Sequence, residues 1–275
     1  MKVWAFCPEI TQKQSPSDRR GTELTLELVI ITALCVGGST ALGALIGYMT
    51  KGVSKAFGDK IMAFAAGVML AAAIIGLIVP SFEAGEGAWI AGAAFGVFAG
   101  AIFIDMLDKA APLLRRLAGR ERTDDSSERA RGVTLFVLAI ALHNLPEGIA
   151  AGVGFGTGNV SDAFLIAAGI ALQNIPEGMV IVSPMMSVGM KPSRALLYAS
   201  LTGVLEVIGT FIGYFAIGVS EALLPFLLAF AGGTMLYVIS DEMIPEIHSG
   251  DDKRNATYAL LFGFVLMMVF DKILG

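Results

Sequence analysis

The sequence predicts an all-α polytopic membrane protein with eight transmembrane helices. Hydrophobic residues make up 55% of the chain and charged residues only 16%, a composition typical of membrane proteins and not of soluble domains. Apolar segments of about 20 residues, the length with which a helix crosses a bilayer, recur along the chain. The 33 glycines are scattered through these segments, as is common where membrane helices pack closely.

Eight segments have this length, and most of the connections between them are short. Residues 1–23 are predicted to form a tail without the pattern of a signal peptide, and residues 24–275 to form the transmembrane domain. The charged residues 108–132 are the longest connection, which we predict to be a mobile loop. The predicted helices are Leu24–Met49, Ile61–Phe82, Ala88–Leu107, Val133–Val153, Ala163–Met186, Ala195–Ile217, Ala222–Ile244 and Thr257–Ile273.

Lysine and arginine residues concentrate in the connections on one side of the predicted membrane domain. These connections follow the first, third, fifth and seventh helices, and the positive-inside rule assigns them to the cytoplasm. Both termini are therefore predicted to be extracytoplasmic, in a multi-pass protein of the plasma (inner) membrane. The residues are Lys51, Lys55, Lys60, Lys109, Arg115, Arg116, Arg120, Arg122, Arg129, Arg131, Lys191, Arg194, Lys253 and Arg254.

Short matches between the first three and the last three helices indicate an internal repeat. Two matches share one sequence offset, and the third lies one residue further along. Chance similarity between apolar helices is the alternative, but the shared offset favours repetition. By the charge rule the two copies cross in opposite directions, which predicts a 3+2+3 inverted repeat. The pairs are Gly43–Tyr48 with Gly209–Tyr214, Ala65–Leu70 with Ala231–Leu236, and Phe95-Gly96 with Phe262-Gly263.

Two related motifs place polar residues inside the fourth and fifth helices. The first, at 143–148, reads His-Asn-Leu-Pro-Glu-Gly, and the second, at 173–178, reads Gln-Asn-Ile-Pro-Glu-Gly. An ionisable residue at bilayer depth costs about 2.5–3.5 kcal/mol on insertion scales, so each glutamate is a candidate functional residue. At helical spacing each glutamate shares a face with the first two residues of its motif.

A proline precedes the glutamate in each motif. We predict that it kinks the helix and frees the carbonyl group of Leu142 or Leu172. Imidazole, amide, carboxylate and carbonyl groups would then converge, and these are ligands for a divalent cation. Glu206 is a third intramembrane carboxylate, for which a protonated side chain bonded to a helix carbonyl is the alternative. Met69, considered alone, is favoured as a core residue.

Acidic residues near helix ends are generally interpreted as solvated caps or loop residues. Asp241 and Glu242 fit that interpretation less well, because they lie in the last turns of an apolar helix.

The paired motifs together with Glu206 resemble the ZIP family of divalent metal transporters, in the bacterial branch related to ZupT and GufA. The resemblance covers all eight helices. It implies a transporter and not an enzyme, which moves chiefly Zn²⁺, with Fe²⁺, Mn²⁺, Co²⁺ and Cd²⁺ as further substrates, into the cytoplasm. It also implies an elevator-like motion of helices 1, 4, 5 and 6 against helices 2, 3, 7 and 8. The metal is then the transported substrate, and no catalytic cofactor is expected.

The resemblance also implies a binuclear metal site inside the membrane. Some relatives carry Asp or His at the positions of Asn174 and Gln173, so the neutral amides here leave metal preference and second-site occupancy open. Residues 108–132 contain no histidine, so the resemblance does not extend to metal sensing by this loop. The first site would use Met69, His143, Glu147, Gln173 and Glu177, and the second Asn144, Glu147, Asn174, Glu177 and Glu206.

Two other classes of function compete with transport. A membrane metal-hydrolase would use the same cluster to activate water, but the chain has only 2 histidines and no His-Glu-x-x-His motif. A non-transporting scaffold gives no reason to bury three carboxylates beside a histidine. The expected partners are divalent metal ions and the lipid bilayer, with a homodimer left open. Nucleic acid is not expected, because no basic patch with interleaved aromatic residues occurs.

Overall fold

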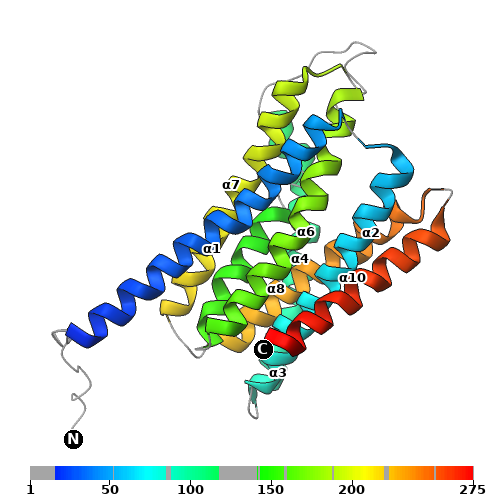
Figure 1. The fold of residues 1–275 in the computed structure, drawn as a ribbon. Coiled ribbons are helices and arrows are strands. Elements are labelled where there is room, and N and C mark those ends of the chain that lie inside the picture. Colours follow the sequence, from blue (N-terminus) through cyan, green and yellow to red (C-terminus); the bar gives the residue numbers. More distant parts are fainter. Residues whose placement is uncertain are drawn as a thin grey trace, which may run out of the picture.

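The computed structural model is a bundle of long helices (Figure 1). It describes residues 16–51, 53–84, 88–117, 141, 143–157, 160–187, 189–219, 223–250 and 252–274. Within these ranges it contains no strand, and 7 helical spans are long and apolar enough to cross a membrane. The prediction of an all-α polytopic membrane protein is therefore confirmed.

The helices follow the predicted segments in order. Ala141 and residues 143–153 are the described part of the predicted fourth helix, whereas residues 133–140 and Leu142 lie outside the described ranges. Residues Lys55–Glu83 form one continuous span, as do residues Leu224–Ile247. The elements are α1 (Pro16–Met49), α2 (Lys55–Ala71), η1 (Ala72–Ile78), α3 (Val79–Glu83), α4 (Ala88–Leu117), η2 (Gly154–Thr157), α6 (Val160–Ser187), α7 (Pro192–Val219), α8 (Leu224–Val238), η4 (Ile239–Met243), α9 (Ile244–Ile247) and α10 (Lys253–Leu274).

Several helices extend beyond their predicted ends, and α1 and α4 extend furthest. Helix α1 begins at Pro16, so residues 16–23 of the predicted tail are helical. Helix α4 continues to Leu117, so the predicted loop 108–132 begins with helix. Lys109 lies one turn after Asp105, with its Nζ 2.6 Å from a carboxylate oxygen, and such pairs support a helix that continues into polar surroundings. The rest of that loop and residues 1–15 lie outside the described ranges.

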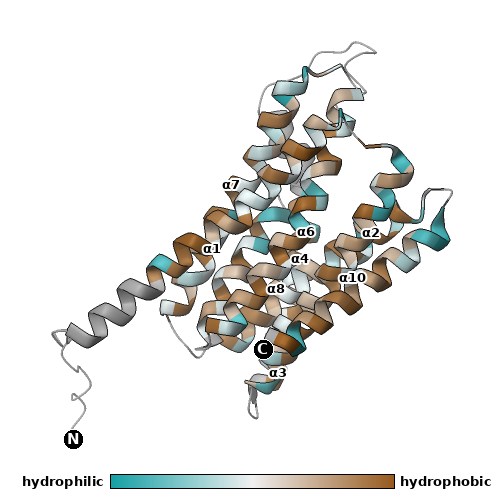
Figure 2. Ribbon diagram, in the orientation of Figure 1, coloured by the Kyte–Doolittle hydropathy of each residue, from teal (hydrophilic) through white to brown (hydrophobic). Residues whose placement is uncertain are grey.

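Apolar residues predominate along the helices of the bundle (Figure 2), and many of the large ones are exposed. Large hydrophobic side chains such as Phe95 and Phe98 of α4 and Phe215 of α7 are 60–69% exposed. Exposed apolar surface of this extent is unusual for a soluble monomer and suits contact with lipid.

The inverted repeat is visible in the way α1 and α7 cross. The two helices run in opposite directions (Figure 1), and each presents a glycine, Gly37 or Gly203, to the backbone carbonyl of the other. The next contacts repeat in the same way. Gly178 of α6 meets the carbonyl group of Thr40 on α1, and Gly148 meets the carbonyl group of Glu206 on α7. Thr40 and Glu206 are separated by 166 residues, so they are counterparts in the two copies.

The third helix of each copy has a different register from the predicted one. Gly100 of α4 meets the carbonyl group of Phe230, and Gly263 of α10 meets that of Phe64. Because Phe64 and Phe230 are counterparts, Gly263 corresponds to Gly100. The predicted match of Gly96 with Gly263 is therefore wrong by one helical turn. Short apolar sequences of α4 and α10 can be aligned almost equally well one turn apart, which explains the error.

Both copies also contain a π-helical turn at matching positions. These turns are η1 and η4, and each is followed by a proline, Pro80 or Pro245, near the start of the next α-helical segment. Proline lacks the amide hydrogen that would continue the α-helical pattern, and a wider turn accommodates its ring. Each π-helical turn lines a cavity of the bundle.

Candidate metal centre

The two polar motifs lie side by side in the interior of the bundle, on helix 143–153 and on α6. Burying polar side chains so completely costs free energy unless they find hydrogen-bond or metal partners. The polar side chains of both motifs, Met69 of α2 and Glu206 of α7 are no more than 4% exposed, except that Glu177 is partly exposed to a cavity. The buried residues are Met69, His143, Asn144, Glu147, Gln173, Asn174 and Glu206.

The last residue of each motif positions a third and a fourth helix against the cluster. A methyl group at Gly148 would collide with the backbone carbonyl of Glu206, and one at Gly178 with that of Thr40. Glycine therefore allows α7 and α1 to approach closely. This approach brings the side chains of Glu206 and Thr40 to the two motifs.

The carboxylate of Glu206 accepts three hydrogen bonds from three different helices. The hydroxyl of Thr40 and the amide of Asn144 donate to Oε1, at 2.5 and 2.6 Å. The amide of Asn174 donates to Oε2 at 2.6 Å. Glu147 accepts one bond, from Nε2 of Gln173 to its Oε1 at 2.7 Å. The structure thus connects both motifs to each other and to Glu206, as expected from the sequence.

Four buried oxygen atoms of the cluster have no hydrogen-bond donor. They are Oδ1 of Asn144, Oε2 of Glu147, Oε1 of Gln173 and Oδ1 of Asn174. A buried acceptor without a donor costs about 1–3 kcal/mol, so such atoms are rare in folded proteins. All four belong to predicted metal ligands, and a cation among them would supply the missing interaction.

The carboxylates are separated by amide groups in this arrangement. Among the described residues, no three His, Cys, Asp or Glu side chains are already gathered around one point as metal ligands. Rotation of the Asn144 and Asn174 amides would replace each donated hydrogen by an oxygen.

His143 connects the cluster to a cavity. Its Nε2 lies 2.9 Å from Oε1 of Glu242 in η4. The cavity has a volume of about 420 Å³, and its lining includes Met69, His143, Glu147 and Glu177 of the predicted site. Asp241 and Glu242 line it as well. These two residues stood out in the sequence, but the spacing of the motifs gave no reason to place them at the site.

A second cavity continues from the first towards one end of the bundle. It has a volume of about 570 Å³ and shares Met62 and Glu246 with the first cavity. It reaches Lys55 at the start of α2 and Ser187 at the end of α6. The cluster is thus adjacent to a route towards the end that carries the lysine-rich connection between α1 and α2.

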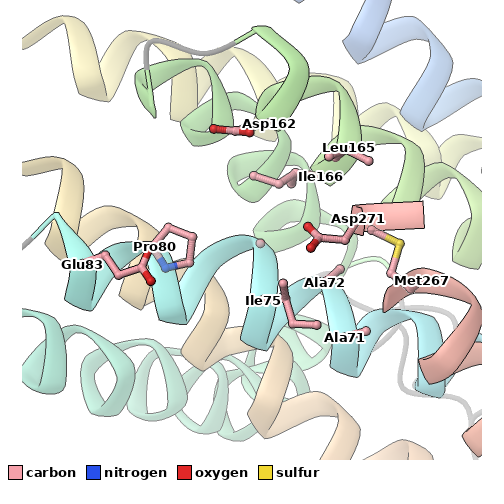
Figure 3. Close-up of a pocket in the computed structure, with 11 residues that line it drawn as sticks. Ala71, Ala72, Ile75, Pro80, Glu83, Asp162, Leu165, Ile166, Met267 and Asp271 are labelled. Carbon is pink, nitrogen blue, oxygen red and sulfur yellow. The ribbon is translucent and has the colours of Figure 1, made fainter. Parts of the chain in front are cut away.

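A third cavity, of about 250 Å³, lies towards the opposite end. Carboxyl groups of Glu83, Asp162 and Asp271 surround it from three helices (Figure 3). Ile75 and Gly76 of η1 line this cavity, at the positions that match Asp241 and Glu242 in the other copy. Its lining contains none of the eight predicted site residues.

Thr40 was absent from the predicted site, although it contacts the cluster directly. A single threonine in an apolar helix carries no signal of its own. Its position in the repeat could have identified it, because it is the counterpart of Glu206.

The fold and the cluster together define a class: a polytopic membrane protein with carboxylate, amide and imidazole groups buried at its centre. The sequence matches the family described as ZIP zinc transporter over residues 115–271. The chain therefore belongs to the ZIP family of zinc transporters, and the resemblance of the paired motifs is confirmed.

Individual relatives extend the match to most of the chain. Zinc transporter GufA of Myxococcus xanthus is 38% identical over 252 residues, which cover 90% of this chain and 98% of the relative. Zinc transporter ZIPB of Bordetella bronchiseptica is 37% identical, over 86% of this chain and 78% of the relative. Zinc transporter ZupT of Streptococcus mutans is 28% identical, over 87% and 94%.

Proposed function

We propose that this protein transports Zn²⁺ across the membrane into the cytoplasm through the buried cluster. The four acceptor oxygens without donors carry this proposal, because they belong to the residues expected to bind metal. The family and the names of the relatives support zinc as the cargo.

The candidate metal-ligating side chains fit two neighbouring metal positions. Zinc accepts imidazole nitrogen and carboxylate oxygen, which His143, Glu147 and Glu177 offer on the cavity side. The thioether of Met69 lines the same cavity and adds a soft ligand that also suits Cd²⁺. Gln173 completes this first position, with its amide oxygen lacking a donor.

The second position is deeper in the bundle and has more oxygen ligands. Asn144 and Asn174 each donate a hydrogen bond to Glu206 there. Glu147 and Glu177 lie between the two positions at helical spacing and would bridge them. Oxygen ligands without sulfur suit harder cations such as Mn²⁺ and Fe²⁺, which we include among the substrates.

The cavities and the charges support the proposed orientation of the bundle in the membrane. The cluster adjoins the cavities that lead towards Lys55, the end assigned to the cytoplasm by the positive-inside rule. The arrangement is consistent with an inward-open state of a protein of the plasma (inner) membrane whose termini are both extracytoplasmic.

Helix packing is consistent with an elevator-like motion. Helix α1 contacts α6 and α7, while α2 contacts α10 and α4 contacts α8. Helix 143–153 packs on α7. The motif helices thus belong to one group with α1 and α7, and the group of α2, α4, α8 and α10 would be the support against which they slide.

Uptake into proteoliposomes that contain only this protein tests the proposal. External Zn²⁺ should accumulate in the vesicles, and a panel of Fe²⁺, Mn²⁺, Co²⁺ and Cd²⁺ measures selectivity. Folded protein that moves none of these ions would contradict transport. Hydrolysis of a lipid or peptide substrate by the same preparation, without metal uptake, would favour the metal-hydrolase alternative.

A further inference from the structure

Thr40 makes a different hydrogen bond from other buried threonines of the bundle. Its hydroxyl donates to Oε1 of Glu206 across the α1–α7 contact, at 2.5 Å. Thr202, Thr210 and Thr234 are equally buried, but each donates to a carbonyl group of its own helix. The Thr40 hydroxyl, which is only 1% exposed, is thus directed to a carboxylate of the cluster.

The three donors to Glu206 differ in what metal binding would require of them. Asn144 and Asn174 each carry an Oδ1 without a donor, and they would have to turn that oxygen to the metal. In doing so both amides withdraw their hydrogen from Glu206. The hydroxyl of Thr40 is not a proposed metal ligand. It can therefore stay hydrogen-bonded to Oε1 of Glu206 before and after metal binding.

The location of Thr40 is fixed by the fold on both sides. Gly178 of the second motif lies against its backbone carbonyl, so α1 packs closely on α6 at this position. Glu206 is held in the same way by Gly148 of the first motif. The inverted repeat therefore brings the two counterpart residues face to face at the deeper metal position.

We propose that Thr40 is a positioning residue of the second metal site. Its hydroxyl holds one oxygen of Glu206 in place, so that the other oxygen is directed to the metal when the two asparagine amides rotate. This inference rests on the proposed function, because it requires that the deeper position binds a cation.

Calorimetric titration of the purified full-length chain with Zn²⁺ tests this role. Thr40→Val removes the hydroxyl at nearly constant volume, Thr40→Ser keeps it, and Thr202→Val is the control for loss of a buried hydroxyl. We expect wild type to bind in two steps and Thr40→Val to weaken the second step by about tenfold to a hundredfold, as is usual for residues that orient a ligand. Thr40→Ser should restore the second step, and Thr202→Val should change neither.

A double-mutant cycle with Glu206→Gln guards against a general loss of structure. If Thr40 acts through Glu206, Thr40→Val should have little further effect on binding in the Glu206→Gln background. Equal weakening of both steps together with a lower Tm, or full retention of the second step, would overturn the proposal. A folded wild type that binds one equivalent would overturn it as well, whereas one that binds no Zn²⁺ would reject the proposed function itself.

Discussion

Nε2 of His143 lies 2.9 Å from Oε1 of Glu242, so the first motif is joined to the π-helical turn of α8. An arriving metal ion competes for the same imidazole nitrogen. Glu242 must then release His143 or accompany it to the metal. Glu242 lines the cavity, so in the proposed elevator-like motion this contact would connect ion occupancy with the interface between the two helix groups.

Glu177→Ala should abolish Zn²⁺ uptake while the protein still inserts and folds. Glu177 is partly exposed to the cavity, so its truncation leaves little buried space unfilled, but it removes a carboxylate that both metal positions would share. Asp252→Ala is a matched control, since Asp252 forms a surface ion pair with Lys60 and an exposed hydrogen bond with Asn255, and surface ion pairs contribute little. Normal uptake by a folded Glu177→Ala variant would remove this residue from the site.

His143→Ala should weaken Zn²⁺ binding by at least about tenfold and more than Asn144→Ala does. An imidazole nitrogen is a better zinc ligand than a neutral amide oxygen. Titration calorimetry on both variants measures the difference. A larger loss from Asn144→Ala would reverse the order of the two positions.

Cysteine labelling should distinguish the two ends of the bundle. In a background with Cys7→Ser and Cys35→Ser, Ser54→Cys should react with an impermeant reagent only from the cytoplasm and Ala84→Cys only from outside. Both positions are exposed, and Ser54 lies between Lys51 and Lys55, which the charge rule assigns to the cytoplasm. The opposite pattern would mean that the topology is inverted.

Zn²⁺ binding should release protons, and its apparent affinity should fall as the pH is lowered. The metal needs an unprotonated imidazole nitrogen at His143 and ionised carboxylates, so protons compete for the same atoms. Asn174→Asp adds one titratable ligand and should release more protons and bind the second metal more tightly. Calorimetry in buffers of different ionisation enthalpy counts the protons, and equal counts in both proteins would contradict the assigned place of Asn174.

Gly178→Ala should destabilise the protein or prevent assembly of the cluster. The added methyl group meets backbone atoms of α1, which cannot rotate away, and overpacking of this kind costs about 1–3 kcal/mol. Gly38→Ala is the control, because nothing lies within 4 Å of a methyl group there. Thermal unfolding in detergent compares the two, and an equal Tm would show that α1 can move aside.

The main features of the fold and cluster were predictable because they depend on local patterns. Apolar runs of membrane-spanning length marked the helices, and the spacing of His143 and Glu147 placed both on one helix face. The contact between His143 and Glu242 was not predictable, since it depends on how a distant helix turns at η4. The register of α10 was also missed, because glycine in apolar sequence matches in more than one alignment.

The contact of Thr40 with Glu206 could not be predicted from the residue type alone. A hydroxyl costs little in an apolar helix when it bonds a carbonyl of its own helix, as Thr202 does. Threonine in a membrane helix therefore carries no functional signal, unlike glutamate. Only the pairing of α1 with α7 reveals that Thr40 faces Glu206.

The two copies of the inverted repeat share their helix packing but differ in where polar and charged residues lie. Glycine contacts recur at counterpart positions, so substitutions there should be tolerated equally badly in both halves. The polar positions are unmatched, with Thr40 opposite Glu206 and Gly76 in the place of Glu242. The cavities at the two ends are lined by different charged residues. An ion would therefore experience a different electrostatic potential from each end, although the helix packing is similar.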